Sequence, residues 1–163
     1  MEQDISHEIE LYLLEVFNTL VEHEVRKARR YKYPLSMICI GVHAEPDTVQ
    51  TQHAAEMVAI NALDAELRDT DIPCRNGSEF FVLLPATDEK GTHHACERLE
   101  MLLNTSDHTH DGAAFQMLSF IGLASIADDL VVSSRTLLDN SRSAMEHARA
   151  TRTLTTVLFS TLR

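Results

Sequence analysis

The sequence predicts an α/β fold of the α+β type, in which a central mixed sheet of five strands is flanked by helices and preceded by a long N-terminal helix. Apolar runs of strand length alternate with amphipathic stretches of helical spacing, in the order α-β-α-β-β-α-β-α-β. The length of 163 residues and the hydrophobic share of 44% suit one compact core. We therefore expect a single domain over residues 1–163, made of an N-terminal helix (1–31) and a sheet-helix core (32–163).

The first element is a helix predicted from Ile5 to Tyr31. Its apolar residues recur every three or four positions, and no Gly or Pro interrupts them. Basic residues gather in its last turns, where cations complement the helix dipole, and Pro34 blocks continuation. The apolar run from Leu35 to Val42 then predicts a strand that is buried on both faces.

A second helix is predicted from Gln50 to Leu67, and a β-hairpin follows from Ile72 to Leu84. We assign the hairpin turn to Asn76-Gly77, because both central residues of a type I′ turn need positive φ and these residue types tolerate it best. The remaining pattern predicts a helix over 87–103, a polar loop over 104–112, a strand over 114–125, a helix over 133–150 and a strand over 154–159.

Composition excludes several classes of function. Lys and Arg total 14 against 25 Asp and Glu, so the net charge of −11 would repel nucleic acid. Cys39, Cys74 and Cys96 form no CxxC pair, which indicates neither a disulfide framework nor a zinc knuckle and favours a reducing cytoplasm. The chain shows no leader pattern and no apolar run of membrane-spanning length, so we expect no membrane insertion by this chain.

Five segments in matching order give the chain a resemblance to the GGDEF domain of bacterial diguanylate cyclases, which condense two GTP into cyclic di-GMP. The segments are HEVRKARRYKYPLSMICIGVH (23–43), LRDTDIPCRNGSEFFVLLP (67–85), ACERLEML (95–102), LSFIGLAS (118–125) and LLDNSRSAMEHARATR (137–152). The residues at the position of the signature Gly-Gly-Asp/Glu-Glu-Phe are Asn76, Gly77, Ser78, Glu79 and Phe80. The resemblance implies the nucleotidyl cyclase-like fold, whose sheet is mainly antiparallel.

The resemblance also identifies the chain as a degenerate member of that family. Mg²⁺ takes hard oxygen ligands, usually one or two carboxylates, when it neutralises a triphosphate. The family supplies them at the end of the first strand and at the third signature position. Here Gly41 and His43 replace the Asp residues of the strand, and Ser78 replaces the signature acid. We therefore expect no catalytic residue, no cyclase activity, no magnesium and no other cofactor.

A second site of the family is retained in this sequence. It is an inhibitory Arg-x-x-Asp motif that binds cyclic di-GMP, supplied here by Arg68 and Asp71, and Arg98 matches a further Arg on the following helix. A guanidinium can hydrogen-bond a phosphate or the O6/N7 edge of guanine, and a carboxylate can accept from guanine N1 and N2. We expect a cyclic di-GMP receptor that relays the signal to a partner or a linked domain, although the chain is one residue short before the signature.

Two other functions stay open. If Arg68 and Asp71 form only a surface ion pair, the chain is a nucleotide-independent module that forms a homodimer or docks on a regulatory protein. Alternatively, cyclic di-GMP or GTP binds in the altered cleft around residues 76–80, where Arg149 and Thr153 align with the family's phosphate-binding Lys and Arg and where Arg152 lies one residue away.

A metal site is a further alternative to a polar, solvated loop for one group of residues. Imidazole and carboxylate groups suit zinc or nickel. The group comprises His93, His94, His108, His110 and Asp111, whose spacing matches no defined metal-binding pattern.

Overall fold

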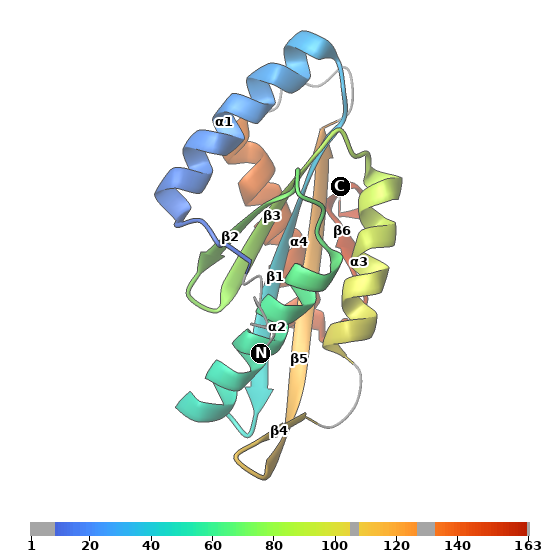
Figure 1. Ribbon diagram of the computed structural model, residues 1–163. Coiled ribbons are helices and arrows are strands. Elements are labelled where there is room, and N and C mark those ends of the chain that lie inside the picture. The colour runs from blue at the N-terminus through green and yellow to red at the C-terminus, as the bar shows by residue number, and fades with distance from the viewer. Residues whose placement is uncertain (1–8, 105–107, 127–132, 163) are drawn as a thin grey trace, which may run out of the picture.

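The computed structural model describes residues 9–104, 108–126 and 133–162. The described helices are α1 (Leu14–Tyr31), α2 (Val49–Glu66), α3 (Glu89–Leu103) and α4 (Ser134–Thr151), followed by the short 3-10 helix η1 (Phe159–Thr161). The described strands are β1 (Leu35–Glu45), β2 (Ile72–Asn76), β3 (Glu79–Pro85), β4 (His108–His110), β5 (Ala113–Ile126) and β6 (Val157–Leu158). Figure 1 shows the strands as one sheet with helices on its faces.

The described strands form a six-stranded sheet in the order β2-β3-β1-β5-β4, and β6 pairs with β5 outside this path. The pairs β2–β3, β3–β1, β1–β5 and β5–β4 are antiparallel, whereas β6 runs parallel to β5. The sheet is thus mixed and mainly antiparallel, as predicted. In the register of the central strand, Gly41 lies between Glu79 of β3 and Phe120 of β5.

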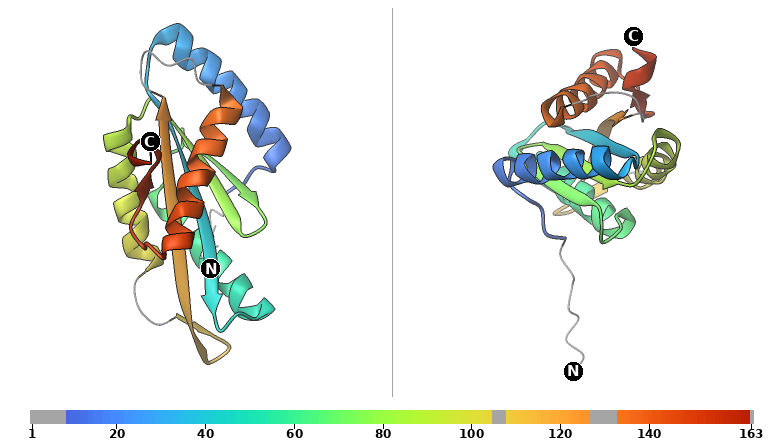
Figure 2. Two further views of the ribbon diagram at one scale, coloured as in Figure 1. Left: turned by 180° about the vertical axis from the view of Figure 1, so that it is seen from behind. Right: turned by 90° about the horizontal axis from the view of Figure 1, so that it is seen from above.

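The two faces of the sheet carry separate cores. One core packs β1 residues such as Ile38 and Ile40 against α2 and α3, and the other packs Met37 and Cys39 against α1 and α4. Successive side chains of a strand point to opposite faces, so a strand covered on both sides reads as an unbroken apolar run. Figure 2, seen from above, shows α4 and α2 on opposite sides of the sheet.

The predicted N-terminal helix is wrong at its start. Residues 5–8 lie outside the described part of the chain, and α1 begins only at Leu14, after an extended stretch. Within that stretch Tyr12 forms a parallel bridge to Cys74 of β2. The free backbone groups of an edge strand offer partners that a first helical turn lacks, and this tertiary pairing overrides the helical periodicity of the sequence.

Two further boundaries differ from the prediction. The stretch 104–112 is more than a loop, because β4 pairs with the start of β5 around Asp111 and Gly112, which both have positive φ. The final strand is also shorter than predicted, since β6 covers Val157–Leu158 and the chain then turns into η1. Among the described residues, no helix combines the length and the apolar character that crossing a bilayer requires.

Candidate functional site

The Arg68–Asp71 turn lies directly after α2, which ends at Glu66 with Leu67 as its C-cap. The Arg68 N–H donates to Asp71 Oδ2 at 2.9 Å, and the Asp71 N–H donates to the Arg68 carbonyl at 3.0 Å. Both residues line a pocket of about 450 Å³. The turn is therefore closed by its own backbone and carboxylate, and it presents both side chains to one cavity.

The Asp71 carboxyl is half-buried, and this burial raises its pKa, whereas the Arg68 backbone hydrogen bond and the Arg68 charge lower it. Within the described chain, the Arg68 guanidinium makes no hydrogen bond or ion pair. Its donors are therefore available to a ligand.

Arg98 reaches the same end of α2 from α3. Its Nε lies 2.8 Å from Glu66 Oε2, and its side chain is 51% exposed. Glu66 stands two residues before Arg68, so this ion pair holds Arg98 beside the turn. The structure does not place Arg98 among the residues that line the pocket. Its role as the third ligand residue stays a prediction.

Sequence analysis missed several residues of this pocket. The remaining lining residues are Ile9, Glu10, Tyr12, Asp64, Leu67, Asp69 and Pro73. Four carboxylates, from Glu10, Asp64, Asp69 and Asp71, thus face one guanidinium. Such a lining does not attract an anion by its overall charge, and it suits the N–H groups of a base better than a bare phosphate. The alternation of Ile9 and Leu11 with Glu10 and Tyr12 was the signal for an extended segment, but it also fits a helix.

The signature hairpin, residues 76–80, turns one residue later than predicted. Asn76 is the last residue of β2 and pairs with Glu79, so Gly77 and Ser78 are the central turn residues. Gly77 has φ 64°, and Ser78 is not among the residues with positive φ. Positive φ at the first central position alone is the pattern of a type II′ turn, which accepts Gly there and an ordinary residue next. Asn76 is therefore a strand residue, and the type I′ assignment was wrong.

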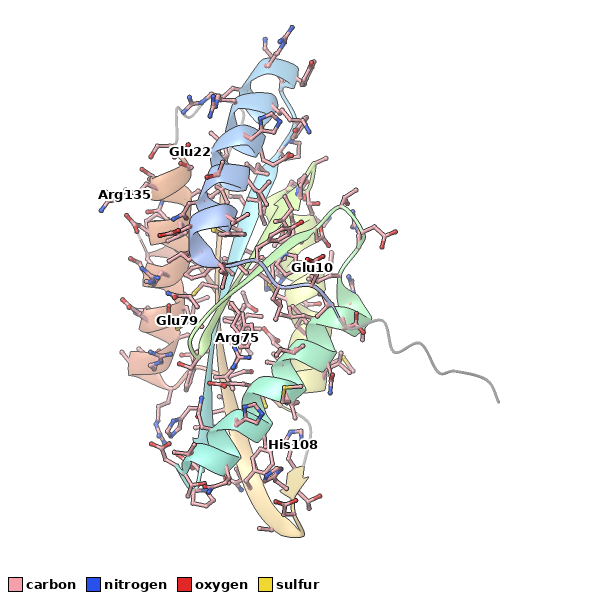
Figure 3. The ribbon with its side chains drawn as sticks, turned by 60° about the vertical axis from the view of Figure 1, so that its left-hand side comes forward. Glu10, Glu22, Arg75, Glu79, His108 and Arg135 are labelled. Carbon is pink, nitrogen blue, oxygen red and sulfur yellow. The ribbon has the colours of Figure 1, made fainter. Side chains whose placement is uncertain are left out.

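Glu79, the acid of the signature hairpin, faces α4. Its Oε2 lies 3.3 Å from Arg142 Nε, and the side chains are 20% and 31% exposed, respectively. Arg142 also lies over the ring of Phe81, 5.1 Å from its centroid. Figure 3 shows Glu79 beside α4, whereas Arg75 of β2 points toward α2, where its Nη2 lies 2.6 Å from Glu56 Oε2. Both strands of the hairpin are thus anchored by ion pairs to helices on opposite faces.

A second pocket, of about 480 Å³, lies at the carboxyl end of β1. It is lined by Val42, His43, Asp47, Gln52, Ser78, Leu118, Phe120, Arg149 and Arg152. Arg152 pairs with Glu45 at 3.4 Å and adopts a left-handed conformation at the end of α4. Thr153 does not line the pocket, and its N–H donates to the Ala148 carbonyl at 2.8 Å. Arg149 and Arg152 therefore supply the cations of this pocket, against one lining carboxylate.

The space above Gly41 is occupied by α4. A Cβ at this position would meet Arg149 Nη2, and it would lie 2.8 Å from Met145 Sδ. A side chain larger than that of Gly has no room here unless Arg149 moves. The guanidinium thus lies where a carboxylate on residue 41 would project.

The other candidate residues do not assemble into a site. Among the described residues, no group of three His, Cys, Asp or Glu side chains is placed to hold a metal ion, so the metal alternative for the histidines at 93, 94, 108 and 110 gains no support. Instead, His93 and His94 pair with Glu97 on α3. Cys39, Cys74 and Cys96 are buried and free, and burial raises the pKa of the Cys74 thiol to about 11. These cysteines are core residues.

The chain matches one family model, described as "Diguanylate cyclase, GGDEF domain", over residues 56–154. Those residues include the C-terminal part of α2, the Arg68–Asp71 turn, the signature hairpin and all of α4. Among curated proteins, none matches the chain significantly in sequence.

Solved structures share the fold at low sequence identity. Diguanylate cyclase SiaD from Pseudomonas aeruginosa, solved in complex with its activator SiaC, matches with a TM-score of 0.80 and 16% identity over 91% of this chain, which spans 58% of that chain. The GGDEF domain of DgcB from Caulobacter crescentus, solved with c-di-GMP, matches with a TM-score of 0.79 and 10% identity over 98% of this chain and 99% of that one. The active GGEEF domain of a diguanylate cyclase from Vibrio cholerae matches with a TM-score of 0.76 and 13% identity, over 92% of this chain and 98% of that one.

Proposed function

The chain belongs to the GGDEF domain family of diguanylate cyclases, and we propose that it is a non-catalytic member that binds cyclic di-GMP at the Arg68–Asp71 turn. It acts as a receptor and not as a synthase. The domain then passes the signal to a protein partner or to a domain linked to it.

The residues around the second pocket support the loss of catalysis. Where the family resemblance implies metal-binding carboxylates, this chain has Gly41 and Ser78, and the space above Gly41 is filled by Arg149. Neither Gly41 nor Ser78 can supply the charged oxygen that Mg²⁺ requires. Removing one electrostatic partner typically costs about 10²- to 10³-fold in rate, so losing two leaves no useful turnover. We expect no pyrophosphate release from GTP with Mg²⁺ or Mn²⁺.

The observation that carries the receptor proposal is the closed turn itself. The Asp71 carboxylate accepts a hydrogen bond from the Arg68 backbone N–H, which closes the turn. The Arg68 guanidinium and the Asp71 carboxylate therefore project from one turn into one pocket. This pair matches the donor and acceptor edges of guanine, whose O6 and N7 accept hydrogen bonds and whose N1 and N2 donate them. The crystal structures of DgcB contain c-di-GMP bound to a domain of this fold.

Calorimetry with cyclic di-GMP tests the proposal. Arg68→Ala should weaken binding by about 5- to 150-fold, the equivalent of a bidentate guanine contact of about 1 to 3 kcal/mol. The matched control is Arg135→Ala, which removes the same charge from a side chain that is 91% exposed on α4. Absence of binding to the wild-type protein, or equal affinity in Arg68→Ala, would refute the proposal.

The second pocket favours one other candidate function, the binding of a nucleotide phosphate in the altered cleft. Two guanidinium groups face that pocket with Asp47 as the one lining carboxylate, a charge balance that the first pocket lacks. If cyclic di-GMP or GTP binds in this cleft, Arg149→Ala should abolish binding of that ligand, while Arg68→Ala should leave its affinity unchanged. The two variants therefore distinguish the sites.

Partner and compartment follow from the receptor proposal. SiaD has been solved with a protein activator, and a regulatory protein or a second copy of the chain is the partner we propose here. The start of α1 offers exposed apolar side chains for such a contact, with Leu13 74% and Val16 49% exposed.

The buried free thiols are compatible with a reducing compartment, so we propose that the domain works in the cytoplasm.

A further inference from the structure

The segment Ile9–Leu13, here called the N-terminal strap, runs along the open edge of β2. The Tyr12 N–H donates to the Pro73 carbonyl at 3.0 Å, and the Arg75 N–H donates to the Tyr12 carbonyl at 3.1 Å. These two bonds make an isolated parallel bridge between Tyr12 and Cys74. The strap thus extends the sheet by one short pairing, and α1 begins immediately after it.

Alternate residues of the strap point in two directions, as they do in any extended chain. Ile9 and Leu11 pack against the core that α2 and α3 cover. Glu10 is exposed, and Tyr12 keeps 37% of its surface accessible. Glu10 and Tyr12 line the same pocket as Arg68 and Asp71, and Figure 3 shows Glu10 where the strap passes the end of α2.

We propose that the N-terminal strap is the third wall of the cyclic di-GMP site, where the Tyr12 ring stacks on a guanine base and Glu10 accepts a hydrogen bond from that base. The inference rests on the proposed function and adds a recognition element to the same pocket. A large aromatic ring left partly open beside a guanidinium and several carboxylates suits a flat base that carries both donors and acceptors.

The position of the strap links ligand binding to α1. Two backbone bonds hold the strap on the edge of β2, so it opens at a lower free energy than the paired strands of the core. A ligand that touches both the strap and the Arg68–Asp71 turn stabilises the docked strap. By reciprocity, a docked strap strengthens ligand binding by the same factor. Because Leu13 is the N-cap of α1, closure of the strap fixes the position at which α1 starts.

Two substitutions at Tyr12 distinguish the contribution of its ring to ligand binding from that of its backbone N–H. Tyr12→Ala removes the ring and keeps the N–H that donates to Pro73, whereas Tyr12→Phe keeps the ring. We expect cyclic di-GMP affinity, measured by calorimetry, to fall by about 5- to 150-fold in Tyr12→Ala, the range of one base-stacking contact. Affinity should stay within about twofold of wild type in Tyr12→Phe and in Tyr31→Ala, which removes an exposed ring outside the strap and the pocket.

Amide hydrogen exchange gives a second readout on the unmodified protein. Saturating cyclic di-GMP should slow exchange at the Tyr12 and Arg75 amides, while the Leu162 amide, which donates to Phe159 outside the pocket, serves as the internal reference. Unchanged exchange at both reporters would refute the strap as a wall of the site. So would wild-type affinity in Tyr12→Ala when Arg68→Ala has lost binding, and this outcome would leave the proposed function standing. Absence of binding to the wild-type protein would overturn both.

Discussion

Glu79 Oε2 lies 3.3 Å from Arg142 Nε, so the acid that remains in the signature hairpin forms an ion pair with α4. Arg142 packs in turn over the Phe81 ring, which belongs to the core beneath α1 and α4. A carboxylate engaged in this way is a structural group that ties β3 to α4.

Glu79→Gln should lower the free energy of unfolding by about 1 kcal/mol, the upper end for surface ion pairs, because both partners are less than one third exposed. Urea denaturation measures the change. Asp139→Asn is the matched control, since the Arg135–Asp139 pair is long at 3.9 Å and highly exposed, and its loss should cost almost nothing. Equal effects of the two substitutions would contradict a structural role for Glu79.

Gly122→Ala should destabilise the protein more than Gly41→Ala. At Gly122 an added Cβ meets backbone atoms of α4, from Met145, Ser141 and Ala144, and backbone cannot move aside. At Gly41 the obstacles are the ends of the Arg149 and Met145 side chains. We expect a loss of about 3 kcal/mol or more at Gly122 and about 1 kcal/mol at Gly41 in urea denaturation. A larger loss at Gly41 would show that Arg149 is fixed above β1.

The pH dependence of stability should differ between the wild-type protein and Asp71→Asn. Burial raises the pKa of Asp71 in the folded state, so the folded protein binds this proton more tightly than the unfolded chain does. The contribution of Asp71 to stability is therefore fully present below its unfolded-state pKa and is lost as the pH rises through the folded-state pKa. The stability of wild type relative to Asp71→Asn, from urea denaturation over a pH series, should fall across this window. A rise would mean that the Arg68 charge and hydrogen bond outweigh burial.

The fold was largely predictable because its core is covered on both faces. The run from Leu35 to Val42 has the composition of a buried central strand, and Pro34 marks a helix end that the structure confirms within a few residues. Local pattern failed where long-range pairing decides the conformation. The strap pairs with β2 some 60 residues away, and β4 pairs with the start of β5.

The candidate sites were predictable only where residues lie close together in sequence. Arg68 and Asp71 lie in one turn because only two residues separate them, and Arg149 and Arg152 lie at one pocket because they end one helix. The Arg98–Glu66 pair joins α3 to α2, and Glu10 and Tyr12 reach the first pocket from the N-terminal strap. These contacts depend on how distant elements pack, which no local sequence pattern encodes. The turn at Gly77 and Ser78 was missed because Asn-Gly and Gly-Ser are both acceptable hairpin dipeptides.

The central claim is that this domain binds cyclic di-GMP through the Arg68–Asp71 turn and without a metal ion. The most direct test is a calorimetric titration of the wild-type protein and Arg68→Ala with cyclic di-GMP in the presence of a chelator. We predict saturable binding to wild type that added Mg²⁺ does not strengthen, and an affinity about 5- to 150-fold weaker in Arg68→Ala. Binding that appears only after Mg²⁺ is added, or that survives unchanged in Arg68→Ala, would contradict the claim.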